Sequence, residues 1–254
     1  MVYRPQQPPA PPPRVSRPFS LDIRWDQRDV VLALGMALAI FIGSTLVLVL
    51  LFGGDDSDAF LKDTNFGGVP AALWIVAAQQ IIFVSAAWRF SVSKYRLDVR
   101  SLGFLRAEGR LPYLVAFGGW IATLFAIVFW QMIIDSLGIE SLTPDNNVDE
   151  VIDFGGNFFT TLLVVGLWGP VAEEIFFRGF ALAGLRRRFG DRTALILTAA
   201  LFAIFHIEPT IYVPIFFFGI VLGWIYLRTN SLWPSILIHV IHNTVILSIT
   251  ILAD

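Results

Sequence analysis

The sequence predicts an all-α, polytopic membrane protein of about seven transmembrane helices, and three observations support this prediction. Hydrophobic residues make up 56% of the 254 residues and charged residues only 15%, a balance that is unusual for a soluble domain of this length. The apolar residues gather in segments close to the roughly 20 residues that a helix needs to cross a bilayer. The basic residues alternate between the connections of these segments, as they do where cytoplasmic loops collect Lys and Arg.

The first 29 residues are rich in proline and arginine, with a nearly continuous proline run at residues 8–13. They contain too few apolar residues to fold alone. We therefore expect residues 1–29 to form a disordered cytoplasmic tail and residues 30–254 to form a single transmembrane domain. The apolar segment that begins near Val30 is longer than the core of a signal peptide, so we expect it to remain as a helix.

Seven apolar segments follow the tail. They lie at about 30–52, 69–88, 112–134, 158–185, 193–207, 211–227 and 232–252. The fifth and sixth are short and only residues 207–210 separate them, so they form either a tight hairpin or one broken unit. We favour the hairpin, because merging the two would place the basic turn at 186–192 and Arg228 on opposite sides of the membrane.

The charges between these segments predict the orientation. Basic residues occupy the tail, the connection after the second segment and the turns after the fourth and sixth segments, whereas Lys62 is the only basic residue among the acidic opposite connections. The N-terminus is therefore expected inside and the C-terminus outside. The Pro-rich tail and the small size favour a bacterial inner membrane as the location.

Charged residues also lie within the fourth segment, where they are costly. A central Asp, Lys or Arg costs about 2.5–3.5 kcal/mol on insertion, so Glu173, Glu174 and Arg178 need internal partners or water. Glu174 and Arg178 lie four residues apart on one helix face and are expected to pair. Glu173 points about 100° away and is left to face another helix. A structural ion-pair cluster is one interpretation, and a functional site is the other.

The histidines favour the functional interpretation, because all three lie in predicted spans. At about 1.5 Å per residue, Glu173 and His206 lie roughly 18–20 Å from the cytoplasmic side, and His239 and Asn243 roughly 12–18 Å. Three helices thus place polar groups in one layer. His239, His242 and Asn243 share a helix face. We favour a chemical role for His239 and a structural role for His242, satisfied by a neighbouring helix.

These residues form three motifs that resemble those of a known family. The motifs are Glu173-Glu174-x-x-x-Arg178, Phe202-x-x-x-His206 and His239-x-x-x-Asn243. They are similar to the motifs of the CPBP family, which contains the type 2 CAAX prenyl proteases and the bacteriocin-processing, or Abi-type, intramembrane proteases. The resemblance covers about residues 100–252, including the stretch at 101–104, and indicates that the catalytic core lies there.

The resemblance implies an intramembrane endopeptidase that hydrolyses a peptide bond with water. By this resemblance, Glu173 and His206 bind and activate the water as general base, while His239 and Asn243 stabilise the oxyanion of the tetrahedral intermediate. The membrane interior suits this chemistry. A region of low dielectric constant favours a carboxylate as general base, and hydrogen-bond donors stabilise an oxyanion strongly where water is scarce.

Glu174 and Arg178 support the site in this interpretation, and the role of His242 stays open. The expected partners are a peptide or membrane-protein substrate and the lipid bilayer, with no nucleic acid. The sequence predicts no oligomeric state, and the five arginines of the tail suit anionic lipid at the inner surface.

The need for a metal is open from the sequence. Glu173, His206 and His239 are a plausible Zn²⁺ set by ligand type, and the family is often labelled as metalloproteases. A metal-free, glutamate-type mechanism is the alternative. We favour the latter, because a set that includes Asn243 matches zinc less well than three histidines or two histidines with a carboxylate. The absence of cysteine excludes cysteine-based zinc sites, disulfides and thiol catalysis.

Two other classes of function fit the same residues. A proton-coupled transporter would use the intramembrane Glu and His side chains as a relay and would show ion flux without proteolysis. The concentration of polar residues in one cluster, with no second series leading to the other face, disfavours it. A non-catalytic membrane scaffold or immunity factor would use the fold as a binding platform, and a Glu173→Ala variant would then keep its phenotype.

Overall fold

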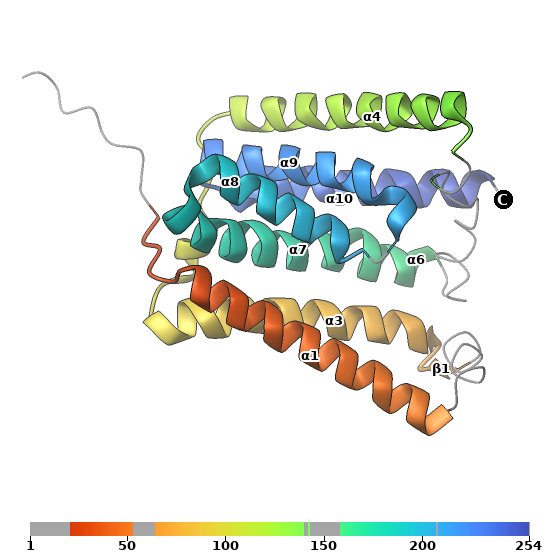
Figure 1. Cartoon of the computed structure of the whole chain (residues 1–254), viewed down its shortest axis with the longest axis horizontal. Coiled ribbons are helices and arrows are strands. Elements are labelled where there is room, and N and C mark those ends of the chain that lie inside the picture. The colour runs from red at the N-terminus through yellow and green to blue at the C-terminus, as the bar shows by residue number, and fades with distance from the viewer. Residues whose placement is uncertain (1–20, 53–63, 140–141, 143–157, 207, 254) are drawn as a thin grey trace, which may run out of the picture.

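The computed structural model describes residues 21–52, 64–139, 142, 158–206 and 208–253, and these are mostly helical (Figure 1). The α-helices are α1 (Gln27–Phe52), α3 (Ala71–Trp88), α4 (Leu111–Leu137), α6 (Phe158–Thr161), α7 (Gly169–Glu173), α8 (Ala183–Ile204), α9 (Tyr212–Thr229) and α10 (Leu232–Ala253). Helices of other pitch are η1 (Arg89–Ser93), η2 (Val99–Leu102), η4 (Leu162–Trp168), η5 (Glu174–Leu182) and η6 (Pro209–Ile211).

The one sheet of the described residues is a minimal hairpin of β1 (Asn65–Phe66) and β2 (Val69–Pro70), which are antiparallel. Gly67 and Gly68 join the strands with φ values of 63° and 79°, the left-handed conformation that a two-residue turn of this kind requires. The hairpin leads directly into α3 and does not change the fold class, so the prediction of an all-α polytopic protein is confirmed.

Six helical stretches of the described residues are long and apolar enough to cross a membrane, and one of them accounts for two predicted segments. The stretch Phe158–Ile204 has 47 residues, roughly 70 Å of helix against a hydrocarbon core of about 30 Å. The backbone leaves helical geometry at Gly190, with φ 74° and ψ 169°. The chain reverses direction in this region (Figure 1), so this stretch contains the fourth and fifth predicted segments.

The fifth and sixth predicted segments form the expected hairpin. α8 ends at Ile204 and α9 begins at Tyr212, with the single turn η6 shortly before it. The two helices pack closely against each other along their length. A close approach of this kind is helped by Gly219, where an added Cβ would lie only 3.1 Å from the Cα of Ala199.

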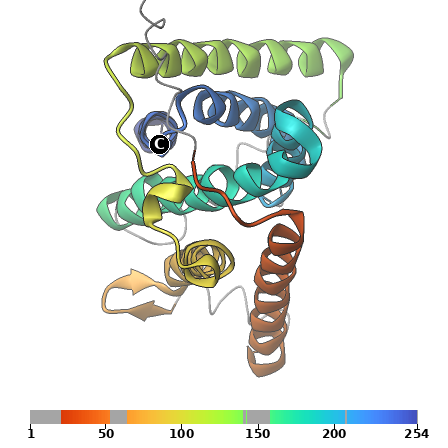
Figure 2. The same cartoon turned by 90° about the vertical axis from the view of Figure 1, so that its left-hand side faces the viewer.

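The helices are arranged so that the fourth predicted segment is central. α4 lies at one edge of the molecule and α1 at the opposite edge, in both views (Figures 1 and 2). Between them, α7 contacts α3 on one side and α10 on the other, while α4 packs on α9 and α10. The outer faces of α1 and α4 carry exposed large apolar side chains, for example Phe125 at 72% exposure, which suits contact with lipid.

The connections that carry most of the basic residues meet at one end of the molecule. The Leu232 N–H donates to the Gly103 carbonyl at 2.8 Å, and Ser231 Oγ donates to the Leu105 carbonyl at 2.5 Å. Arg187 Nη1 donates to the carbonyl of Arg24 at 2.6 Å. These bonds bring the basic connections together at one end of the bundle; most of the acidic opposite connections lie outside the described residues, and the assignment of the basic end to the cytoplasm stays a prediction.

The folded part of the chain begins before residue 30, where we expected it to start. Trp25 is fully buried; its ring stacks on Phe180 with centroids 6.1 Å apart, and its Nε1 donates to the Phe180 carbonyl at 2.8 Å. Gly184 leaves room for the ring, because an added Cβ there would come within 2.8 Å of it. Residues 21–29 thus belong to the membrane domain, and the expected disorder of residues 1–20 falls outside the described residues.

Replacing Trp25 is expected to destabilise the bundle. Trp25→Ala removes a buried ring and should lower the free energy of unfolding by about 3–5 kcal/mol. Trp25→Phe keeps most of the ring contact but loses one hydrogen bond, and should cost about 1 kcal/mol for that bond. Thermal unfolding of the purified variants in one detergent measures both. Equal unfolding temperatures for Trp25→Ala and wild type would show that this segment is not an anchor.

A candidate active site between α3, α7, α8 and α10

Glu173 stands at the end of α7, a short α-helical piece between two stretches of wide helical turns. Pro170 lies at the start of this piece and has no N–H to donate. The Gly169 N–H bonds to the Val164 carbonyl, five residues back instead of four. The helix around Pro170 is distorted into wide turns in η4 and η5 on either side of α7. Such turns inside helices are frequent at functional sites.

Glu173 faces two other helices. Its Oε1 accepts a hydrogen bond from Gln80 Nε2 of α3 at 3.1 Å. Its Oε2 lies 3.7 Å from Nε2 of His239 on α10. The side chain is 15% exposed, so it is enclosed but still reachable. The separation around the helix that we inferred from the sequence therefore directs Glu173 away from Arg178 and toward a neighbouring histidine.

Glu174 and Arg178 form the pair that their spacing predicted. Arg178 Nη1 lies 2.7 Å from Glu174 Oε1, and the side chains are 2% and 0% exposed, respectively. Arg178 Nη2 also donates to the Gly219 carbonyl at 3.3 Å, and the guanidinium carbon lies 4.3 Å from the ring centroid of Phe202. These contacts join η5 to α8 and α9 and partly compensate for burying a charge.

His239 lies between the two glutamates and is buried. Its Nδ1 is 2.8 Å from Glu174 Oε1, while its Nε2 points toward Glu173. A carboxylate only accepts hydrogen bonds, so Nδ1 carries the hydrogen when Glu174 is ionised beside Arg178. The Nε2 atom of a neutral His239 ring is then an acceptor. His239 can donate from Nε2 only when the ring holds a second proton.

His206 has a tautomer set by the backbone. Its Nδ1 is 2.8 Å from the Phe202 carbonyl, one helical turn earlier. A carbonyl accepts only, so Nδ1 donates and the Nε2 atom keeps a lone pair. That lone pair can accept a hydrogen bond from a water molecule. The spacing of four residues between Phe202 and His206 therefore places the Phe202 carbonyl where it fixes the tautomer of His206.

His242 and Asn243 each make a contact that fixes the side chain. Trp120 Nε1 of α4 donates to His242 Nδ1 at 3.3 Å, and the His242 ring lies 4.3 Å from that of Phe218. The neighbouring helix that we expected to satisfy His242 is thus α4. Asn243 Nδ2 donates to the Val165 carbonyl at 3.0 Å, which uses one of its two amide hydrogens and leaves the other for a ligand.

One cavity of about 410 Å³ brings these side chains together. Its wall includes the four residues that the motifs predicted as catalytic, Glu173, His206, His239 and Asn243. Gln80 and His242 also line it. The rest of the wall is mostly apolar, as in sites that enclose an organic ligand. Glu174 and Arg178 do not line the cavity; they lie behind His239 in the protein interior.

The comparison with protein families supports the same part of the chain. Residues 155–245 match the family described as type II CAAX prenyl endopeptidase Rce1-like. These residues are an Rce1-like domain, and the resemblance to the CPBP family is confirmed. The Rce1-like domain contains all three motifs. The family supports an intramembrane endopeptidase in general, with a peptide as its substrate. The chain itself is a multi-pass membrane protein. Neither the curated proteins nor the solved structures gave a match to the chain.

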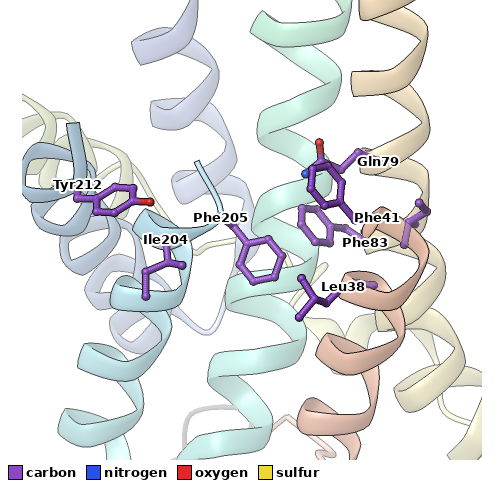
Figure 3. Close-up of a pocket in the computed structure, with 9 residues that line it drawn as sticks. Leu38, Phe41, Gln79, Phe83, Ile204, Phe205 and Tyr212 are labelled. Carbon is purple, nitrogen blue, oxygen red and sulfur yellow. The ribbon is translucent and has the colours of Figure 1, made fainter. Parts of the chain in front are cut away.

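A second cavity, of about 380 Å³, lies between α1, α3 and the start of α9 (Figure 3). Leu38, Phe41 and Phe83 give it an apolar wall, and its polar side chains are Gln79 and Tyr212. No acidic, basic or histidine side chain is among its lining residues. The groups that can do acid–base chemistry therefore line the other cavity, next to the Rce1-like motifs.

The zinc set considered from the sequence is Glu173, His206 and His239, and it stays an alternative to a metal-free site. No group of three or more His, Cys, Asp and Glu side chains among the described residues is placed to hold a metal ion. The Nδ1 contacts of His239 with Glu174 and of His206 with the Phe202 carbonyl leave the Nε2 atom of each ring free, as in histidines that bind a metal. The need for a metal therefore stays a prediction.

Two side chains beside the cavity were missed by the sequence reasoning. Gln80 contacts Glu173, and Trp120 contacts His242, and both lie outside the Rce1-like domain. The pair Gln79-Gln80 in the middle of the second span was a usable signal, because an amide in a membrane helix needs a partner. Trp120 gave none, since tryptophan is common in membrane helices near the interface.

Proposed function

We propose that this protein is an intramembrane endopeptidase that hydrolyses a peptide bond in a peptide or small membrane protein. The observation that carries the proposal is one cavity where Glu173 of α7, His206 just after α8, and His239 and Asn243 of α10 converge. Its location within an Rce1-like domain supports a protease over other uses of an intramembrane carboxylate. The proposed location is a bacterial cell membrane, with the N-terminus inside.

The proposed first step is attack by water on the substrate carbonyl carbon. Glu173 takes a proton from the water while the Nε2 lone pair of His206 accepts a hydrogen bond from the same molecule. A general base held in this way contributes about 10²–10⁴ in rate. The O–H bond of the water breaks, a C–O bond forms, and the carbonyl oxygen becomes an oxyanion that requires donors.

Asn243 and His239 are the proposed donors. Asn243 has one amide hydrogen left after its bond to Val165. His239 becomes a donor from Nε2 when the proton that Glu173 took from the water passes to it, from Glu173 Oε2 to His239 Nε2, two atoms that lie 3.7 Å apart. The charged ring is then bonded to Glu174 on its other side. The proton finally moves to the amine nitrogen as the C–N bond breaks, which restores the starting charges.

Glu174 and Arg178 act as positioning residues in this proposal. Arg178 holds Glu174 in place through their ion pair, and Glu174 sets the orientation of the His239 ring. One Arg and one protonated His balance the two carboxylates during the reaction. The low dielectric of the interior makes this balance valuable, because an uncompensated buried charge is costly.

We further propose that the reaction needs no metal, and removal of metal ions tests this point. Purified full-length protein in liposomes is incubated with a quenched fluorescent peptide library, with and without a strong chelator. Cleavage in both arms is expected. Loss of cleavage with the chelator and recovery on adding Zn²⁺ would establish a metalloprotease instead. A lack of cleavage across a broad library, with ion flux in the same liposomes, would favour the transporter.

A further inference from the structure

Gln80 of α3 contacts the proposed catalytic carboxylate of Glu173 through its side-chain amide. Its Nε2 donates to Glu173 Oε1 at 3.1 Å, and the residue is 6% exposed. Gln80 also lines the cavity that holds Glu173, His206 and His239. It lies about 75 residues before the start of the Rce1-like domain, so no motif of that domain includes it.

The orientation of the Gln80 amide is fixed by chemistry. A carboxylate only accepts hydrogen bonds, so the amide NH₂ must face Glu173 and the amide oxygen must face away. That oxygen is buried and has no hydrogen-bond partner within the described part of the chain. A buried acceptor without a partner costs about 1–3 kcal/mol. Leucine, which is similar in size, would avoid that cost, so the gain from Gln80 is its hydrogen bond to the Glu173 carboxylate.

The backbone opposite Gln80 leaves space for this contact. Gly169 lies one helical turn before Glu173, on the same face of α7. An added Cβ at Gly169 would lie 3.8 Å from Gln80 Nε2 and 4.0 Å from Glu173 Oε1. A longer side chain at this position would therefore extend into the space that the amide and the carboxylate share. Gly169 keeps that space open for α3 and α7.

We propose that Gln80 is a positioning residue for Glu173, an inference that rests on the proposed function. By holding Oε1, the amide fixes the rotamer of Glu173 and leaves Oε2 on the side of His239 and the reacting water. The amide also donates to the ionised form of the base. Gln80 thus extends the active site beyond the Rce1-like domain to α3, which lies on the opposite side of α7 from α10.

The first test replaces the amide without changing the size of the side chain much. Gln80→Leu should lower kcat about 10- to 100-fold, since a hydrogen bond to a charged group is lost at the base, while KM stays within about threefold. Its unfolding temperature should stay within a few degrees of wild type. Gln79→Leu is the matched control, because Gln79 faces the second cavity (Figure 3) and its loss should leave kcat unchanged.

The second test is Gln80→Glu, for which the pH dependence of kcat is measured. A purely structural role for Gln80 would not change that pH dependence in the way described next. When protonated, the new carboxyl can donate to Glu173 as the amide does; when ionised, it repels Glu173. The kcat profile should therefore gain a fall at high pH that the wild type lacks. The other titratable or charged groups around Glu173 are unchanged in this variant: Glu174, Arg178, His206, His239 and His242.

The outcomes separate this inference from the function on which it rests. If the wild type cleaves and Glu173→Gln does not, yet Gln80→Leu and Gln80→Glu match the wild type in kcat and pH profile, the role of Gln80 is rejected and the protease stands. If the wild type does not cleave, both proposals are rejected together. If Gln80→Leu does not fold, the pH profile of Gln80→Glu decides.

Discussion

Glu173→Gln should lower kcat by roughly 10³-fold or more, the largest effect on activity that we expect from one substitution. Glutamine has nearly the same shape as glutamate but cannot take a proton from water. Its amide oxygen can still accept the bond from Gln80 Nε2, so the packing of α3 on α7 should persist. Initial rates on a peptide that the wild type cleaves measure the effect, with both proteins purified in the same way.

The matched control is Glu108→Gln, the same chemical change at an exposed position outside the cavity. It should leave kcat and the unfolding temperature unchanged. A Glu173→Gln variant that cleaves at the wild-type rate would reject a protease that uses Glu173 as base. Residual cleavage that is equal in both variants and insensitive to substrate choice would instead reveal a contaminating protease.

The membrane helices were predictable because their signal is local. A run of apolar residues with few charges is enough to place a span, and basic residues in alternate connections are enough to pair the spans. Trp25 was missed because its anchoring depends on a pocket formed by Phe180 and Gly184, about 155 residues away. The proline-rich composition around it indicates disorder on average and carries no information about that pocket.

The motif residues were predictable in part for the same reason. The pairing of Glu174 with Arg178 follows from a spacing of four residues, and the direction of Glu173 follows from the next position on the helix. Two contacts join different helices: Glu174 with His239, and Glu173 with Gln80. The spacing of residues within one helix cannot predict either contact. The site residues that the resemblance implied all lie within the Rce1-like domain, whereas Gln80 lies outside it, so the resemblance could not have indicated Gln80.

Arg178→Met is expected to destabilise the protein as strongly as Trp25→Ala does. This change keeps most of the apolar stem but leaves Glu174, which is fully buried, without its counter-charge. Breaking one side of a buried ion pair costs about 3–5 kcal/mol, because the remaining charge stays desolvated. The neutral His239 ring would still donate to Oε1 of Glu174, but the second oxygen is buried and has no hydrogen-bond partner among the described residues. We expect a large fall in unfolding temperature in detergent.

The double variant Glu174→Gln, Arg178→Met removes both charges and should recover most of the lost stability, since neutral side chains of similar size suit a buried position better than a lone charge. The cleavage activity should not recover with it, because a glutamine at 174 no longer sets the His239 ring with a carboxylate. Recovery of stability without activity would assign the pair a role in positioning His239. If the double variant is as unstable as Arg178→Met, then the bond from Arg178 to the Gly219 carbonyl, rather than the pairing of charges, holds η5 against α9.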